Sequence, residues 1–219
     1  MTAQTPVSRS YGAGSASRES DASHAFAVGT RTRLACPMAN PGYNGMWLPQ
    51  DQDPRAEAGE TRGELDTLVG YLEAYRTTLE LKCEGLTPVQ LGTRSVPPSN
   101  MSLLGLVRHM ARVEQSWFRR VIEDQLDIPR HFQEEELDAG FAWPGEADDA
   151  LVAAAWELWR DEVAHARDVL GRTDLDALVD VHGDPTEVRD IIVHMIEEYA
   201  RHCGHADLIR ECIDGRAGQ

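Results

Sequence analysis

The sequence predicts an all-α protein whose folded part is a four-helix bundle, preceded by a disordered N-terminal tail. Four long segments repeat apolar residues at the three- and four-residue steps of an amphipathic helix. No segment shows the alternating pattern that requires a sheet, and no repeat of fixed period occurs. The chain has 219 residues, 42% of them hydrophobic, which is enough for one packed core. Four helices of this length fit a bundle.

The first predicted helix runs from about residue 61 to residue 83, and Gly85 can end it. The second runs from about residue 102 to residue 123. Either Ser99 or Ser102 can cap it, because a serine hydroxyl accepts from an unpaired amide of the first turn. The apolar stripes are Leu65, Leu68, Leu72, Tyr75 and Leu79 on the first helix, and Leu103, Leu106, Met110, Val113, Trp117 and Val121 on the second.

A connection of about 25 residues separates the second and third helices, and loops of that length are usually functional or partly disordered. It contains the acidic run at 134–136 and can cross the end of the bundle. The third helix is expected from about 148 to 170 and the fourth from about 186 to 213. The apolar stripe of the third helix is Leu151, Ala155, Leu158, Val163 and Val169. That of the fourth is Val188, Ile192, Met195, Tyr199, Ala206 and Ile209.

Residues 1–57 differ in composition from residues 58–219, which we expect to form the bundle domain. The N-terminal part is rich in Ser, Gly, Ala, Pro and Thr and has no sustained periodicity, so we expect most of it to be disordered. Trp47 and Leu48 are the expected exception, because their side chains can dock on the bundle.

Charge and composition exclude several classes of function. Acidic residues outnumber basic ones 37 to 21, a formal charge of -16, which argues against nucleic-acid binding. No apolar run approaches the roughly 20 residues that span a membrane, and the apolar run at 25–28 is too short for a signal peptide. The four cysteines form no CxxC pair, which suits the cytoplasm. Met38 and Met46 are alternative start positions.

The fourth predicted helix gathers four residues of metal-ligand type on one side: His194, Glu198, His202 and His205. At 100° per residue they share a sector of about 80° that overlaps the apolar stripe. Polar groups in such a position need partners or a cation. On the second helix, His109 also lies within the apolar arc. One His from one helix and a Glu and a His at i, i+4 on another can form a tetrahedral site, suited to Zn²⁺ and less selectively to Ni²⁺ or Fe²⁺.

The same residues also have a structural interpretation. A histidine on a helix is more often a core or surface residue than a ligand, and ExxxH alone is a weak motif, so the residues leave both interpretations open. Cys203 points about 100° away from His202 and is not counted as a ligand. Trp156 and Trp159 are expected to serve packing. Three further histidines are expected to be solvated: His131, His165 and His182.

Two long motifs resemble the DUF664 (mini-circle protein) branch of the DinB/YfiT-like superfamily. The first is SLLGLVRHMARVE at 102–114 with Trp117-Phe118, and the second is HMIEEYARHCGHADLIRE at 194–211 with Ile-Asp-Gly at 213–215. The similarity spans about residues 46–218. It implies a DinB-type four-helix bundle, often a homodimer, in which one His of the second helix and an HxxxH pair of the last helix hold a divalent metal.

The chain departs from that pattern at Glu198, which stands where the family has the first histidine of the pair. The implied metal ligands are therefore His109, Glu198 and His202. The related mycothiol-dependent maleylpyruvate isomerases also use a His, Glu, His set. His194 and His205 match further polar positions and are expected to orient Glu198 or a bound water. A site in which His205 or His194 replaces Glu198 stays open.

Three protein ligands leave one coordination position open, which is typical of a catalytic site. The metal, most simply zinc, can then activate either water or a thiol. The resemblance favours the thiol, because members act as S-transferases or isomerases that use mycothiol or bacillithiol. Lys82 is the only lysine in the chain, a bias typical of GC-rich genomes, which favours mycothiol. We expect a metal-bound thiolate to attack a small electrophile. A metal-dependent hydrolase and a non-catalytic, stress-related metal- or ligand-binding dimer are the alternatives.

Four charged residues near the ligands are further candidates. Arg108 and Arg112 are expected to bind carboxylates of the thiol or the acceptor, and Arg201 to assist catalysis. Glu114 is a candidate proton shuttle. In the alternative interpretation, the three arginines are ordinary surface residues and Glu114 is a solvated helix residue.

Overall fold

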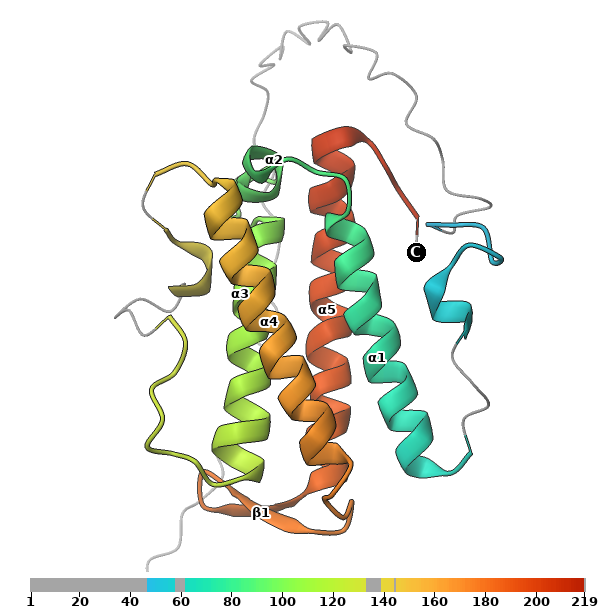
Figure 1. Ribbon diagram of the computed structural model, residues 1–219, viewed down its shortest axis with the longest axis vertical. Helices are drawn as coiled ribbons and strands as arrows, with labels where there is room; N and C mark the ends of the chain where they lie inside the picture. Colours follow the sequence, from blue (N-terminus) through green and yellow to red (C-terminus); the bar gives the residue numbers. More distant parts are fainter. Residues whose placement is uncertain (1–46, 58–61, 133–138, 144, 219) are drawn as a thin grey trace, which may run out of the picture. The chain divides into compact units, whose positions relative to one another are not determined.

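The computed structural model describes residues 47–57, 62–132, 139–143 and 145–218. All of them belong to one compact unit, residues 35–219. Most of the tail expected to be disordered, and the acidic run at 134–136, lie outside the described residues. Four long helices lie side by side, as Figure 1 shows, so the predicted all-α bundle is confirmed. They are α1 (Glu64–Cys83), α3 (Leu103–Glu114), α4 (Asp149–Leu170) and α5 (Val188–Asp214).

The bundle is held together by the predicted apolar stripes. Helix α1 packs mainly along α5, and α3 along α4. The core is built from apolar side chains of all four helices, because each presents one apolar face to its neighbours. Leu65, at the first turn of α1, is the exception, since about a third of it (36%) is exposed. Among the described residues, no helix is long and apolar enough to cross a membrane.

The helix ends follow local capping chemistry. Ser102 caps α3, because its hydroxyl accepts from the Gly105 amide at 3.2 Å, so of the two predicted caps this is the one used. Asp148 caps α4 by accepting from the Leu151 amide at 2.8 Å. Gly215 ends α5 in the left-handed conformation, at φ 78°. A short helix, α2 (Pro88–Gly92), lies between α1 and α3.

The second predicted helix is not regular throughout. After Glu114 the chain continues as a π-helix, η3 (Gln115–Ile122), and the Glu123 amide donates to the Phe118 carbonyl at 3.2 Å. Each π turn holds more residues than an α turn, which changes the direction of the side chains that follow. Such segments are frequent at functional sites. Here η3 carries Trp117 and Arg120 to the cavity described below.

A two-stranded antiparallel hairpin, β1 (Leu178–Val181) and β2 (Asp184–Glu187), corrects the prediction that no segment forms a sheet. The fourth helix begins at Val188, directly after β2 and close to the predicted start at about residue 186. The turn residues His182 and Gly183 have φ values of 57° and 98°. Two left-handed residues make the tight turn that suits a hairpin, and the His-Gly pair was the signal for it in the sequence.

The described N-terminal segment docks on the bundle through Trp47, as predicted. Its side chain is buried, and its ring lies 3.9 Å from Lys82 Nζ and 3.7 Å from the Arg216 guanidinium. Leu48 is half-buried. In the short helix η2 (Pro54–Glu57), Arg55 pairs with Asp53. The boundary between extension and bundle domain at residue 57 stays a prediction.

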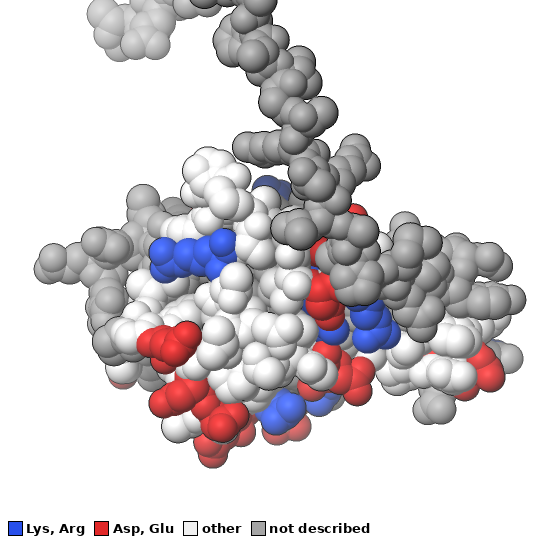
Figure 2. Space-filling model, turned by 90° about the horizontal axis from the view of Figure 1, so that it is seen from above, with Lys and Arg blue, Asp and Glu red and all other residues white. Residues whose placement is uncertain are grey.

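Figure 2 views the protein from the end at which α2 lies. Much of the described surface on this face is uncharged, and acidic side chains gather along one edge beside several basic ones.

Candidate metal centre and adjoining cavity

Helices α3 and α5 bring together the three residues predicted to bind a metal. The candidate ligand atoms of His109, Glu198 and His202 all lie within 4.8 Å of one another. The His109 and His202 rings meet edge to face with centroids 4.7 Å apart, and His202 Nε2 lies 3.5 Å from Glu198 Oε2. Glu198 and His202 share one side of α5 because they are four residues apart. Two imidazole nitrogens and a carboxylate oxygen therefore face a common point.

The electrostatic environment keeps both imidazoles neutral. Burial, together with the neighbouring His202, lowers the pKa of His109 to about 4. Burial also lowers the pKa of His202 to about 4, helped by His205 and Arg201. A neutral imidazole keeps a lone pair free to bind a cation. At neutral pH these two side chains are therefore in the form that a metal requires.

His194 and His205 each adjoin one member of this group. His194 Nε2 lies 3.7 Å from Glu198 Oε1, and the His194 ring packs on Trp117 with centroids 4.6 Å apart. His205 Nδ1 lies 3.4 Å from Nδ1 of His202. His202 thus faces Glu198 with one ring nitrogen and His205 with the other. Among the described residues, the group of candidate ligands contains Glu198 and neither His205 nor His194.

A glycine lets the segment 139–143 pack closely behind His109. A β-carbon at Gly140 would lie 3.2 Å from both Cα and N of His109, so only glycine fits without displacing backbone. The Phe141 ring stacks on the His109 ring with centroids 5.5 Å apart. Arg108 donates to the Gly140 carbonyl at 3.0 Å and to the Ala142 carbonyl at 3.2 Å. Arg108, predicted to bind a carboxylate, thus holds the segment that supports His109.

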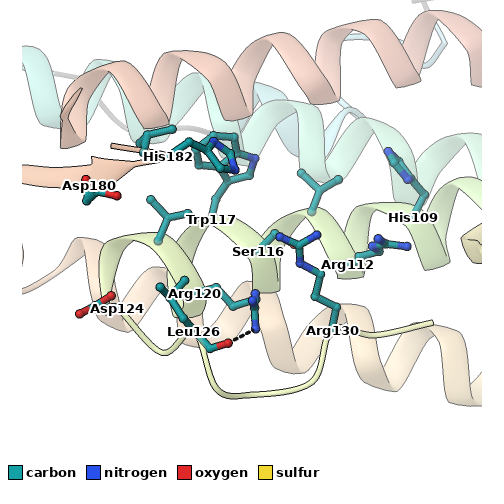
Figure 3. A pocket seen from close by; sticks show the side chains of 13 residues that line it. His109, Arg112, Ser116, Trp117, Arg120, Asp124, Leu126, Arg130, Asp180 and His182 are labelled. Atoms are coloured by element: carbon teal, nitrogen blue, oxygen red, sulfur yellow. Dashed lines mark hydrogen bonds between the residues drawn. The ribbon is translucent and has the colours of Figure 1, made fainter. Parts of the chain in front are cut away.

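A cavity of about 430 Å³ adjoins the candidate metal centre. His109 and Arg112 of α3 line it at one end, as Figure 3 shows, and Trp117 of η3 lies deeper along it. The segment after η3 contributes Arg130, and the hairpin contributes His182. His182 is exposed, as expected, and the hairpin turn also places it in this wall. The volume is that of a small-molecule site.

Glu114 does not have the surroundings expected of a proton shuttle. It is fully buried and accepts from Arg76 Nε at 2.9 Å, from Arg76 Nη2 at 2.7 Å and from the Tyr199 hydroxyl at 2.6 Å. The Tyr199 hydroxyl in turn accepts from Trp159 Nε1 at 2.9 Å. These four residues come from the four long helices, so the hydrogen bonds of Glu114 belong to a network that links the helices. Nothing in the sequence predicted this network, because Arg76 and Tyr199 lie among apolar residues of their helices.

Arg201 is exposed on α5 and does not line the cavity.

The expectation that His131 and His165 are solvated is wrong. His131 lies 2.8 Å from a carboxylate oxygen of Glu162, and His165 lies 2.6 Å from one of Glu123; both rings are largely buried. These carboxylates also bind arginines, which makes the pairs part of the packing between η3, its following segment and α4.

Two further predictions concern Cys203 and the tryptophan pair. Burial raises the pKa of the Cys203 thiol to about 12, and its sulfur contacts the Tyr75 carbonyl at 3.5 Å, so it is not placed as a ligand. Trp156 and Trp159 meet edge to face with centroids 5.4 Å apart, and Trp159 is buried. Both tryptophans pack against the core, as predicted.

The bundle and its His-Glu-His group define a protein of the DinB/YfiT-like class. A family model described as mycothiol S-transferase matches residues 67–215, and the chain belongs to this DinB/YfiT-like family. No curated protein matches the sequence. A solved structure, a conserved protein from Enterococcus faecalis, is similar with a TM-score of 0.51 at 17% identity, covering 70% of this chain and 99% of that one. That similarity supports the fold alone.

Proposed function

We propose that this protein transfers mycothiol to a small electrophile in a reaction that needs a divalent metal held by His109, Glu198 and His202. The observation that carries the proposal is the meeting of these three candidate ligands within 4.8 Å, in a member of the mycothiol S-transferase family. The cavity beside His109 offers room for an acceptor molecule.

The donor set fits a divalent metal of the zinc type. Two neutral imidazoles and one carboxylate match the three protein ligands of catalytic zinc sites, and Ni²⁺ or Fe²⁺ fit less selectively. When bound, such an ion lowers the pKa of a thiol at its open position, so that the sulfur is available as a thiolate nucleophile. The family favours this use over the activation of water for hydrolysis.

The surrounding residues orient the ligands. His205, 3.4 Å from His202, favours one tautomer and orientation of that ring, and His194, 3.7 Å from Glu198, restrains its carboxylate. The segment around Gly140 supports His109 from behind. In the proposed reaction the thiol sulfur forms a bond to the electrophilic carbon. The thiol proton passes to the acceptor in an addition, or leaves with the departing group in a displacement.

The test is metal analysis of the purified full chain, followed by a thiol-transfer assay with 1-chloro-2,4-dinitrobenzene as the electrophile. We expect close to one equivalent of metal, and loss of both metal and mycothiol-dependent transfer in His109→Ala and His202→Ala. His165→Gln, which alters a largely buried histidine outside the cluster, is the matched control and should retain both.

Other outcomes would replace the proposal. Ester hydrolysis that needs the metal but no thiol would identify a hydrolase, and bound metal without either activity would identify a binding protein. Absence of metal in the parent protein would refute every catalytic version. We also propose that the protein is a cytoplasmic homodimer, and light scattering on the purified chain tests the dimer.

A further inference from the structure

We propose that the cavity beside His109 binds the carboxylate of an electrophilic substrate through Arg112 and Arg130. This inference rests on the proposed function and deepens it, because it defines the acceptor as an organic carboxylate with an apolar body. It assigns a role to Arg130, which the sequence motifs do not include.

The first observation is that these two arginines have no acidic partner in the part of the chain that the structure describes. Other arginines of the bundle are paired, as Arg119 is with Glu162. Among the described residues, neither Arg112 nor Arg130 forms an ion pair, although the chain carries a net charge of -16. To the residues that the structure describes, Arg112 donates one hydrogen bond, at 3.4 Å to the Phe132 carbonyl, out of the five that a guanidinium can donate. Both side chains therefore have donors available for an anion.

The second observation is where the two side chains point. Arg112 lies one turn after His109 on α3, whereas Arg130 comes from the segment after η3. Figure 3 shows both guanidinium groups in the part of the cavity between His109 and Trp117. Two like charges that line one cavity are stabilised by an anion bound between them, and guanidinium groups bind carboxylates with paired hydrogen bonds.

The third observation is that the backbone around Arg130 is held in place. The buried Gln115 side chain donates to the Pro129 carbonyl at 3.2 Å and accepts from the His131 amide at 2.9 Å. Arg120 also lines the cavity, and it donates to the carbonyls of Leu126, at 2.9 Å, and Ile128. Arg120 therefore acts as a positioning residue for this segment. A site whose backbone is already ordered loses less entropy when a ligand binds.

The rest of the cavity defines the body of the ligand. Val113, Trp117 and Val121 contribute apolar side chains to the lining. The acidic residues Asp124 and Asp180 lie at the opposite end, next to the hairpin, away from Arg112 (Figure 3). This distribution favours a ligand whose carboxylate lies near His109 and whose apolar body extends along Trp117.

The test is calorimetric titration of the full chain with phenylacetate and with its uncharged analogue phenylacetamide. Because a carboxylate can bind a metal directly, each titration is made on both metal-loaded and chelator-treated protein. We expect phenylacetate to bind roughly tenfold more tightly than the amide in both forms. Arg112→Gln and Arg130→Gln should each weaken phenylacetate binding about five- to tenfold. Arg160→Gln, at an exposed arginine of α4, is the matched control and should change nothing.

A kinetic measurement accompanies the titrations. With 4-chloro-3-nitrobenzoate and its amide as acceptors, Arg130→Gln should raise KM for the acid several-fold and leave KM for the amide unchanged. Equal binding of acid and amide, or equal weakening by Arg160→Gln, would overturn the inference while metal binding and transfer remain. Arginine-dependent phenylacetate binding in a protein without metal or transfer would instead refute the proposed function and leave an anion site.

Discussion

The hydroxyl of Tyr199 donates a hydrogen bond of 2.6 Å to Glu114 in the middle of the bundle, and thereby joins the two helices that carry the candidate metal ligands. Tyr199 directly follows Glu198 on α5, and Glu114 lies five residues after His109 on α3. Arg76 and Trp159 extend this network to α1 and α4. The network therefore holds α3 and α5 in a defined relative position. The distances between the candidate ligands depend on that position.

Tyr199→Phe should destabilise the protein and weaken metal binding. The substitution leaves Trp159 Nε1 without its acceptor and removes one donor from Glu114, both in the buried core. We expect the free energy of unfolding to fall by about 1–3 kcal/mol in urea titrations. Tyr71→Phe, at an exposed position of α1, should have almost no effect. Equal stability of the two variants would show that the network contributes nothing.

Glu114→Gln tests whether this glutamate is structural or moves a proton. The variant removes the buried carboxylate that pairs with Arg76 and leaves the guanidinium with Glu73 alone, and breaking such a buried pair costs up to about 3–5 kcal/mol. Adding Arg76→Met should restore part of this loss, because it removes the buried charge that has lost this partner. Transfer activity per folded molecule should change little. A loss of activity at full stability would instead support the proton-shuttle role.

His205→Ala should lower metal affinity without removing a ligand. The His205 ring lies beside His202 and restrains it, and loss of such a neighbour typically reduces metal affinity about 10- to 100-fold. Competition with a chromophoric chelator measures the affinity. His182→Ala alters a cavity histidine that does not touch His202 and serves as control. If His205→Ala removed the metal entirely, His205 would be a ligand in place of Glu198.

Gly140→Ala should destabilise the protein, and Gly204→Ala should not. A β-carbon at Gly140 would press on the backbone of His109, at a cost of about 1–3 kcal/mol. At Gly204, inside α5, nothing lies within 4 Å of the added methyl group. Alanine there should raise stability by about 0.5–1 kcal/mol, because it favours the helix. Thermal unfolding of both variants measures whether stability falls in Gly140→Ala and rises in Gly204→Ala. Metal affinity is measured for Gly140→Ala as well.

The stability of the bundle should fall in acid through Glu162. Burial alone would raise the pKa of this carboxyl, but hydrogen bonds from His131 and Arg119 lower it overall. The ionised form is thus stabilised on folding, and this contribution is present above the unfolded pKa and lost as pH falls through the lower folded pKa. Glu162→Gln should flatten the decline below about pH 4.5. Urea titrations between pH 3 and 7 measure it, with the exposed Glu157→Gln as control. An unchanged pH profile would contradict the assignment.

Helical periodicity was sufficient to predict the four long helices and the placement of Glu198 and His202 on one side of α5. It also limited the cap of α3 to two serines, because capping depends on hydrogen bonds within a few residues. The contact between Tyr199 and Glu114, and the position of Arg130 in the cavity beside His109, could be seen only in the folded chain. Such contacts join segments far apart in the chain, and they depend on how helices pack and where connecting segments fold back. Periodicity along one helix carries no information about them.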